Sequence, residues 1–516
     1  MREKFVSIVS GNQGQITVFL SLIFMILMGV GFCILEGINL YMKDSLAEEA
    51  FIEAGNEILT NYHRQLFEKY HIFFMDPEEK TQIVEDGKKY INQYLDKNSC
   101  FSFQCRELSV TEEKTAVDED GLYLKHQIRE WMKYRELEKA GAAINKLFES
   151  TSSVEQRKGS VQNEIGIVGE EIEQETMETG DNEDTRNNAS PTLDGREGIR
   201  WNELKQVLQQ ICHSGILFYV IDDSGQISDL TMEEHDLPSK KKGIGKEKNI
   251  DFLFSFSDLR TWKNVLGNID ISKPDARLLS DDYFMAEYVF EHFGGYGRKN
   301  KTSQTALQYE IEYLIGGRES DRDNLKLVAN RILLLRFLMN YGCASNNHEI
   351  NAVAGTMADA LSGVLGLPVA REAVRILLIA SVSYGESLLD VHTLFSGGKI
   401  PALKDDSTWN LYFHNAAELL RKKERVKTGK INVGYEDYLK LLLSMKKQVN
   451  SLEYRMMDLM QVNLCLEQPD FLMEKCLFRF RWQGMMAYPA SSFMAALQGY
   501  KGNSGVLVTL DRVNSY

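Results

Sequence analysis

The chain has 516 residues and a formal net charge of −15 at pH 7. Its length allows roughly two to four domains with cores of their own. The acidic balance argues against a nucleic-acid binder, because affinity for phosphate backbones comes from clustered Lys and Arg.

An apolar segment near the N-terminus is the clearest feature of the chain. No charged side chain interrupts the run from Ile16 to Leu35. At about 1.5 Å per residue, such a helix crosses the ~30 Å hydrocarbon layer of a bilayer. A cleaved secretory signal has a shorter apolar core and a small-x-small site, to which Gly29 to Gly31 is the nearest match, so we predict an uncleaved anchor. Its membrane-facing residues are Ile16, Phe19, Leu20, Leu22, Ile23, Phe24, Ile26, Leu27, Val30, Phe32, Ile34 and Leu35.

Charges on either side of this run predict its orientation. Arg2 and Lys4 precede it, whereas Glu36, Asp44 and Glu48 follow it. The positive-inside rule therefore places the short N-terminus in the cytoplasm and the rest of the chain outside the cell membrane, as a single-pass protein.

Helical spacing continues beyond the apolar run. We predict one helix from Ile16 to about Lys69, with charged residues on its other faces. A helix that is half in the membrane and half outside is the architecture of type IV pilins and pseudopilins, although a simple stalk fits equally well. The predicted stalk face consists of Ala47, Phe51, Ala54, Ile58, Tyr62 and Leu66.

The next segments alternate in character. Pro77 is expected to open a helix, a strand is expected from Phe101 to Val110, and residues 121–148 are expected to form an amphipathic helix. From about 150 the chain becomes acidic and poor in apolar residues, which predicts a flexible linker. The expected organisation is a cytoplasmic N-terminus (1–15), a transmembrane helix (16–35), a stalk helix (36–70), a small α+β region (71–149), a flexible acidic linker (150–198) and a helix-rich ectodomain with a few strands (199–516).

The C-terminal half predicts a mainly helical domain. Its one good strand candidate is Gly215 to Asp222, which carries several β-favouring residues before a turn. The fold class is therefore mainly α with a minor β component (α+β). The expected helices are Phe284 to Phe293, Glu310 to Gly316, Asp321 to Tyr341, Asn351 to Leu365, Ala370 to His392, Ala416 to Arg425, Tyr435 to Leu464 and Ser491 to Gln498.

Motifs of familiar hydrolases and metalloenzymes are absent from the sequence. Asp222 and Ser224 resemble part of the Asp-x-Ser-x-Ser cation site of von Willebrand type A domains, but Gln226 stands where the second Ser belongs. A simple turn between two strands explains these residues without a metal. Asp390 with His392 forms a close His and carboxylate pairing, which is more typical of a surface bond than of a metal site.

Acidic pairs on predicted helices raise the question of glycosidase chemistry. Tyr384 and Glu386 are close in sequence, as are Glu436 and Asp437, but sequence spacing does not place two carboxylates across a groove. Among the cysteines, only the pairs 100/105 and 465/476 are near enough in sequence to suggest disulfides, and free thiols explain them as well. We expect no cofactor.

Several segments together are similar to a known family. They are GQITVFLSLIFMILMGV, AEEAFIEAGNEILTNYHRQLFEKYHIFFMD, QIREWMKYR, GILFYVIDDSGQISD and EYLIGGRESDRDNLKLVANRILLLR. They resemble a membrane-anchored family of unknown function from Gram-positive bacteria, found near genes of Tad/Flp pilus systems and akin at its N-terminus to TadE/TadG-like proteins. The chain departs from the prepilin pattern, since a cut after Gly14 or Gly11 leaves Phe19 or Ile16 where a Glu is usual.

The resemblance implies a non-enzymatic, single-pass surface protein, an accessory or minor pilin-like component of a Tad/Flp-type pilus or secretion apparatus. Its expected partners are the lipid bilayer and other pilus or secretion components, bound through the N-terminal helix, with no nucleic acid. Two alternatives stay open at this point: a membrane-tethered hydrolase of the cell wall, and a cation-dependent adhesin that uses Asp222 and Ser224.

Overall fold

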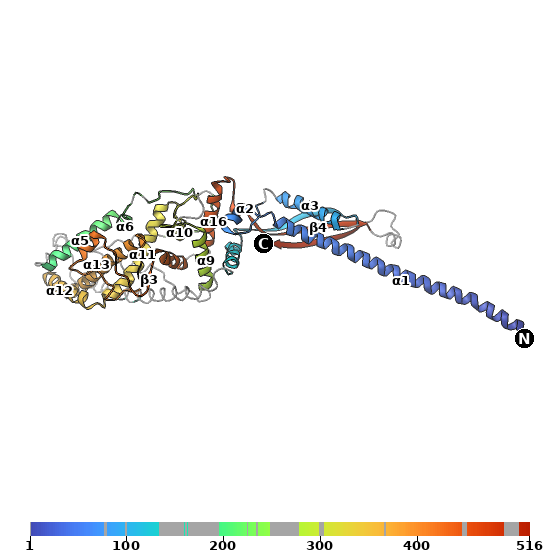
Figure 1. The fold of residues 1–516 in the computed structure, drawn as a ribbon, viewed down its shortest axis with the longest axis horizontal. Coiled ribbons are helices and arrows are strands. Elements are labelled where there is room, and N and C mark those ends of the chain that lie inside the picture. The colour runs from blue at the N-terminus through green and yellow to red at the C-terminus, as the bar shows by residue number, and fades with distance from the viewer. Residues whose placement is uncertain are drawn as a thin grey trace, which may run out of the picture. The chain divides into compact units, whose positions relative to one another are not determined.

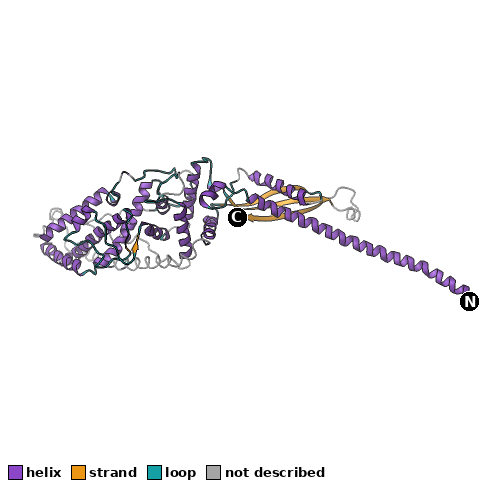
Figure 2. Cartoon of the chain, viewed as in Figure 1, coloured by secondary structure: helices purple, strands orange, loops and turns teal. Residues whose placement is uncertain are grey.

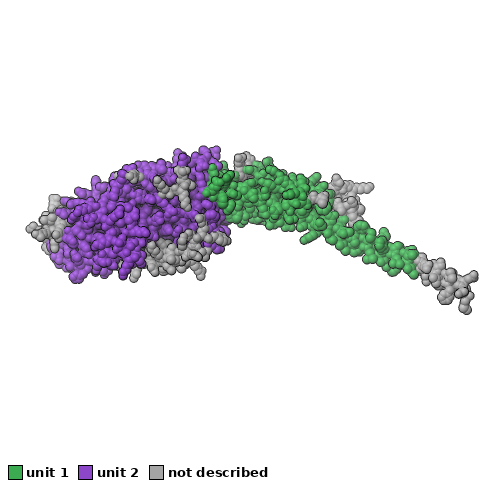
Figure 3. Space-filling model, viewed as in Figure 1, with its two compact units in different colours: residues 1–68, 72–118, 474–516 green, residues 69–71, 119–473 purple. Residues whose placement is uncertain are grey.

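The computed structural model of the chain contains two compact units (Figure 3). Unit 1 comprises residues 1–68, 72–118 and 474–516, and unit 2 comprises residues 69–71 and 119–473. The predicted fold class, mainly α with a minor β component, is confirmed. The structure describes residues 2–76, 80–98, 101–133, 159, 163, 196–223, 225, 227–233, 236–247, 278–298, 304–365, 368–445, 451–489 and 505–516.

Unit 1 is built on a long helix, α1 (Arg2–Leu59), which contains the apolar run and continues well beyond it (Figure 1). Side chains from Ile16 to Met42 are exposed or half-buried, whereas Lys43 is buried. The Lys43 Nζ donates a hydrogen bond to the carbonyl oxygen of Pro489 at 3.2 Å. The helix therefore enters the folded part of unit 1 at Lys43.

The helix ends earlier than the sequence predicts. A turn at 60–63 separates α1 from α2 (Arg64–Tyr70), so the prediction of one helix to Lys69 is wrong beyond Leu59. The backbone N–H of His63 donates to the carbonyl oxygen of Phe74, and the His63 Nδ1 accepts the N–H of Leu66. These bonds take the place of the hydrogen bonds that would continue the helix. Tyr62 therefore lies in the turn, where its ring packs on those of Phe67 and Phe73.

Three antiparallel strands complete unit 1 together with α3 (Lys80–Asn98) (Figure 2). The strands are β1 (Gln104–Thr115), β4 (Leu477–Pro489) and β5 (Gly505–Ser515), and β4 lies in the middle. The helix predicted after Pro77 and the strand predicted from Phe101 are confirmed with shifted ends. The sequence analysis did not predict β4 and β5, which pair residues from the far end of the chain with β1.

The core of unit 1 lies between the second half of α1, α3 and the sheet. Phe51 of α1 stacks on Trp482 of β4 with ring centroids 4.4 Å apart. A Cβ on Gly484 of β4 lies 2.8 Å from the Phe51 ring, so the helix and the strand approach this closely only with glycine there. Ala47, Ala50, Ala54 and Ile58 of α1 are also buried in this core.

Unit 2 is helical in most of its described residues. Its long helices α11 (Asp321–Ala344) and α12 (His348–Leu365) both pack against α13 (Pro368–Phe395), which forms the centre of the unit. The other elements described in unit 2 are η1 (Glu119–Gly121), a helix at 122–133, α5 (Arg196–Ser214), α6 (Ile216–Val220), α7 (Pro238–Lys241), α9 (Leu278–His292), α10 (Glu310–Gly316), β2 (Ile400–Pro401), α14 (Ala416–Lys422), β3 (Asn432–Val433), α15 (Tyr435–Ser444), α16 (Ser451–Cys465) and the start of η4 (Met473–Lys475).

The strand predicted from Gly215 to Asp222 is wrong, because Ile216 to Val220 form the short helix α6. Gly215 adopts a φ of 89°, so the chain turns between the end of α5 and the start of α6. Helix α6 contacts α11 and α13, and its side chains other than that of Phe218 are buried. Strand preference depends on a neighbouring strand to pair with, and in the described part of unit 2 only β2 and β3 are strands, which pair with each other.

The predicted helices that fall on described residues of the C-terminal half agree with the structure except at one place. The segment from Tyr435 to Leu464 holds two helices, α15 and α16, in place of one. The helix predicted from Ser491 to Gln498 and nearly all of the linker predicted at 150–198 lie outside the described residues. The expected segment boundaries therefore remain predictions.

Candidate functional site

The apolar part of α1 presents its side chains outward on every face. All twelve predicted membrane-facing residues are exposed, from 38% for Ile23 to 65% for Phe19. Among the described residues, α1 is the one helix long and apolar enough to cross a membrane, with a mean hydropathy of 2.8 over its best window. A signal sequence near the N-terminus has the same properties. A helix that is apolar all round needs an apolar environment, and unit 1 does not cover this part.

The predicted stalk face takes part in packing instead of facing solvent. Ala47, Phe51, Ala54 and Ile58 are buried in the core of unit 1. Tyr62 lies in the turn after α1, and Leu66 is buried in α2. The second half of α1 is thus an integral part of a folded unit.

Asp222, the candidate metal ligand, is held by two nitrogen donors. Its Oδ1 accepts hydrogen bonds from the Lys423 Nζ and the His392 Nε2, both at 3.1 Å. These bonds, the one from Lys423 first, lower the pKa of Asp222, while burial lowers the pKa of His392. Ser224, the second candidate, lies outside the described residues, and no cluster of three potential metal ligands occurs among those that are described.

The residues after Asp222 form the turn that the sequence suggested. The Oδ1 of Asp223 accepts the backbone N–H of Gly225 at 3.1 Å, which is an Asx turn. This turn follows a helix and does not connect two strands. It has a structural explanation that requires no cation.

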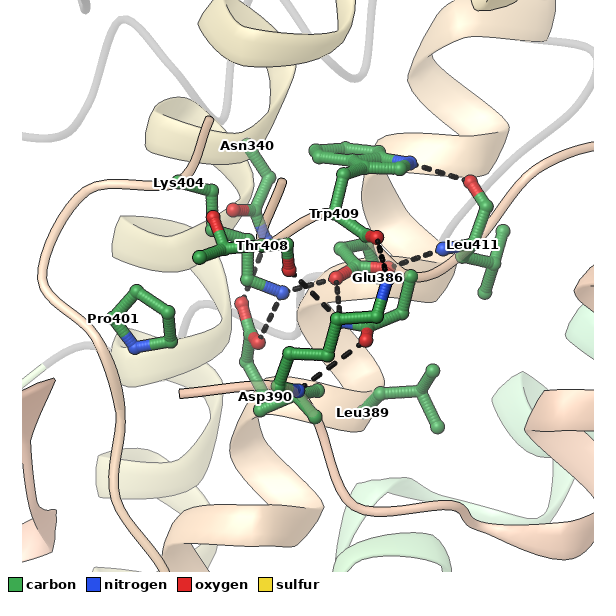
Figure 4. Close-up of polar contacts among 12 residues, drawn as sticks. Asn340, Glu386, Leu389, Asp390, Pro401, Lys404, Thr408, Trp409 and Leu411 are labelled. Atoms are coloured by element: carbon green, nitrogen blue, oxygen red, sulfur yellow. Dashed lines mark hydrogen bonds and ion pairs between the residues drawn. The ribbon is translucent and has the colours of Figure 1, made fainter. Parts of the chain in front are cut away.

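Carboxylates from α13 meet two basic side chains inside unit 2 (Figure 4). We call Arg336, Glu386, Asp390 and Lys404 the buried charge cluster. The side chains of all four are 0% exposed. Lys404 reaches in from the segment after β2 and lies between the two carboxylates, in contact with Glu386 and with its Nζ 2.6 Å from the Asp390 Oδ1.

Arg336 of α11 completes the cluster on the other side of Asp390. Its Nε donates to the Asp390 Oδ2 at 2.9 Å, and Asn340 donates to the same oxygen at 2.8 Å. Burial alone raises the pKa of Asp390, but Arg336 and then Lys404 outweigh it, so the pKa stays below its usual range. The cluster carries two positive and two negative groups and is therefore electrically balanced.

Glu386 has a second set of donors. The backbone N–H of Leu411 donates to its Oε2 at 2.9 Å, and the Asn410 Nδ2 donates to its Oε1 at 2.8 Å. Trp409, also wholly buried, places its ring centroid 5.9 Å from the Lys404 Nζ. With both carboxylates closed off from solvent, the Glu386 and Asp390 pair does not flank a groove for a sugar chain.

A second buried acid lies on α10. The Glu312 Oε1 accepts hydrogen bonds from the Tyr435 hydroxyl at 2.8 Å and the Tyr296 backbone N–H at 3.0 Å. No basic side chain pairs with it in the contacts of the described residues. Burial raises the pKa of Glu312 to about 7, so this acid is about half protonated at neutral pH.

Two further pairs of ionisable side chains lie at the surface, whereas His392, which the sequence paired with Asp390, is buried and bonds Asp222 instead. Glu436 is exposed and lies 3.3 Å from Arg298. Glu349 and His414 are 3.9 Å apart at the rim of a cavity of about 400 Å³, which lies between the start of α12 and residues 412–414. The cavity walls are mainly apolar, with Met357 and Phe413 among them.

The thiols in the described residues do not form the disulfides that sequence spacing suggested. Cys465 and Cys476 are not joined by a disulfide, so the pair 465/476 is not formed. Cys105 is free as well, and Cys100 lies outside the described residues.

The sequence analysis missed the buried charge cluster, although one signal was available. Arg336 stands within the otherwise apolar run from Ile332 to Leu338, and Glu386 and Asp390 are four residues apart on one face of a helix with few other charges. Charged residues on a buried helical face require partners. The sequence does not show that Lys404 is the second basic partner of these carboxylates.

Comparison with known protein families gives a match to the C-terminal part of the chain. A family model described as a family of unknown function (DUF5702) matches residues 197–487, which include most of unit 2 and strand β4. Comparisons with curated proteins and with solved structures give no significant match. The match spans more than half of the sequence and includes the whole buried charge cluster. The chain therefore belongs to the DUF5702 family of unknown function.

Proposed function

We propose that this chain is a single-pass, membrane-anchored surface protein that works through protein contacts and not through a reaction. The N-terminus lies in the cytoplasm, and the part of unit 1 after the apolar run lies outside the cell, as does unit 2. More specifically, we propose an accessory or minor pilin-like role in a Tad/Flp-type pilus or secretion apparatus.

One observation carries the proposal of an anchor. Helix α1 runs without a break from an exposed apolar half into the core of unit 1, where Phe51 stacks on Trp482. A removable leader has no need to continue into a folded core, whereas an anchor that belongs to a unit positions that unit at the membrane surface. This continuity favours an uncleaved anchor over a signal sequence.

The pilus role is supported by architecture and by resemblance. In unit 1 the N-terminal helix has an exposed apolar half and a second half that packs on an antiparallel sheet, and a helix divided in this way between membrane and exterior is the architecture of type IV pilins and pseudopilins. The N-terminal segment resembles TadE/TadG-like proteins. In such an assembly the exposed half of α1 would pack on neighbouring helices within the bilayer.

A non-enzymatic role is the simpler interpretation of the acidic residues. Glu386 and Asp390, which lie on either side of Lys404, are wholly buried. Asp222 already bonds Lys423 and His392. We therefore assign neither wall hydrolysis nor cation-dependent adhesion to these residues.

Membrane fractionation tests the anchor. The double variant F24R/L27R places two charges in the apolar run, each costing about 2.5 to 3.5 kcal/mol on insertion scales. We expect the wild-type chain in the membrane pellet after an alkaline carbonate wash and the variant in the soluble or degraded fraction. The matched control F24L/L27I keeps the apolar character and should stay in the pellet. A wild-type chain released by the wash contradicts the proposal.

A helix exchange tests the pilus role separately. Residues 16–35 are replaced by an unrelated apolar span of the same length, which preserves anchoring. If the exposed face of α1 binds other components, the exchanged protein stays in the membrane but no longer co-purifies with pilus or secretion components. Unchanged co-purification and pilus assembly would leave only the anchor.

A further inference from the structure

The buried charge cluster brings an amine and a carboxyl group into direct contact, closed off from bulk solvent. The Lys404 Nζ contacts the Glu386 carboxylate, and both side chains are 0% exposed. We propose that Lys404 and Glu386 become joined by an intramolecular amide bond, formed by the protein itself, which links α13 to the segment after β2.

Glu386 is placed as the carbonyl donor because its oxygens already receive two hydrogen bonds. The backbone N–H of Leu411 and the side-chain amide of Asn410 donate to Oε2 and Oε1 respectively. Attack on a carboxyl carbon places negative charge on oxygen, and fixed donors of this kind stabilise that charge in a site without water. Lys404 approaches the same carboxyl group.

Asp390 is placed to move the proton. Its Oδ1 lies 2.6 Å from the Lys404 Nζ, while its Oδ2 is held by Arg336 and Asn340. A carboxylate fixed next to the attacking nitrogen can take up the proton that this nitrogen must lose. The bond from Arg336 keeps Asp390 ionised and ready to accept it.

The step is balanced without any further reagent. The ammonium of Lys404 gives a proton to the Glu386 carboxylate, and the resulting amine attacks the carbon of the carboxylic acid. Asp390 takes the second proton from nitrogen and returns it to the leaving hydroxyl group. One C–N bond forms, one C–O bond breaks, and one water molecule leaves, so an ammonium and a carboxylate become an amide and water.

Burial favours the product. An ion pair taken out of water loses several kcal/mol of solvation per ion, whereas an amide is neutral. After the reaction, Arg336 and Asp390 remain as a balanced pair. Groups held in contact react with effective concentrations of about 10⁵ to 10⁸ M, which can offset the low reactivity of an unactivated acid. The ring of Trp409 and the surrounding helices exclude the water that would reverse the step.

Peptide mass spectrometry on the full chain tests the proposal. An Arg-specific protease cuts after Arg375 and Arg421 and releases residues 376–421, which contain both Glu386 and Lys404 but no other Arg before the end and no Cys. We expect this peptide, from denatured wild-type protein, to be lighter than its sequence by one water. Fragmentation between residues 387 and 403 should release no separate pieces, because the amide closes a ring. A peptide of full mass overturns the proposal.

Variants identify the atoms. K404M removes the amine and should restore the full mass, whereas K399M, which changes an exposed lysine in the same peptide, should retain the loss. D390N cannot accept the proton and should also give the full mass. An E386Q peptide that still lacks one water, or a K404M peptide that does, would show that the bond forms elsewhere. The wild-type measurement stands even where a variant does not fold.

Discussion

Glu312 should make the stability of unit 2 fall as the pH rises towards neutral, and E312Q should abolish that fall. The acid is buried on α10, and its pKa is raised to about 7 because burial disfavours the charged form. Tyr435 and Tyr296 donate to its Oε1 but leave it without a positive partner. Glutamine keeps the shape and an oxygen that accepts the same bonds, and it does not titrate.

The size and sign follow from the two states. A pKa raised from 4.5 to about 7 corresponds to about 3 kcal/mol between protonation states. Below pH 4.5 the acid is neutral in both the folded and the unfolded chain, and the contribution is fully present. As the pH rises to 7, the unfolded chain releases its proton while the folded chain keeps it, so the free energy of unfolding decreases by that amount.

Urea unfolding of the full chain in detergent, followed by the helical circular dichroism signal, measures the effect. Between pH 4.5 and pH 7.5 we expect the wild-type chain to lose about 3 kcal/mol relative to E312Q. The control E436Q removes an exposed acid on the neighbouring helix α15 and should keep the wild-type dependence. Equal pH dependence in wild type and E312Q would refute the reasoning.

Three further predictions concern other parts of the chain. W482A removes a wholly buried ring from unit 1 and should lower the free energy of unfolding, measured in urea, by about 3 to 5 kcal/mol. R481A, on the exposed face of β4, should lower it far less. Equal losses would contradict the placement of Trp482 in the core of unit 1. R336A leaves Asp390 buried without its guanidinium partner and should destabilise unit 2 by about 3 to 5 kcal/mol, which a melt unchanged from wild type would disprove. Mg²⁺ should not raise the melting temperature of the wild-type chain more than that of D222N, because Lys423 and His392 already donate to the Asp222 carboxylate. A rise that only the wild type shows would support a cation site at Asp222.

The helices were predicted well because the signals that define a helix lie within its own residues and next to its ends. The apolar residues of α11, α12 and α13 recur at helical spacing. Helix ends can also carry a local signal, such as Gly317, which adopts the left-handed conformation after α10. The end of α1 at Leu59 was harder to predict, because the bonds that stop the helix come from Phe74, beyond the turn.

The strands show the opposite case. GILFYVID has strong strand preference, but the residues described around it offer no strand to pair with, and Ile216 to Val220 fold as α6. In β4 the alternation FRFRWQ at 478–483 is a strand pattern that the analysis did not use, and its partner β1 lies in the first quarter of the chain. Pairing over such a distance has no local signature.

The buried charge cluster combines both situations. The apolar surroundings of Arg336 and the spacing of Glu386 and Asp390 are visible in the sequence, and they indicate buried charges. That Lys404, from a loop, lies between the two carboxylates follows only from the packing of α11, α13 and β2.

The intact mass and N-terminal sequence of the chain recovered from carbonate-washed membranes show whether α1 is a permanent anchor. We expect a chain that remains in the membrane pellet and keeps all of Ile16 to Leu35, since α1 is proposed as the anchor and is also part of the core of unit 1. A chain found in the soluble fraction with its first residue after Gly31 would show that the apolar run is a removable signal, and would refute the proposed anchor.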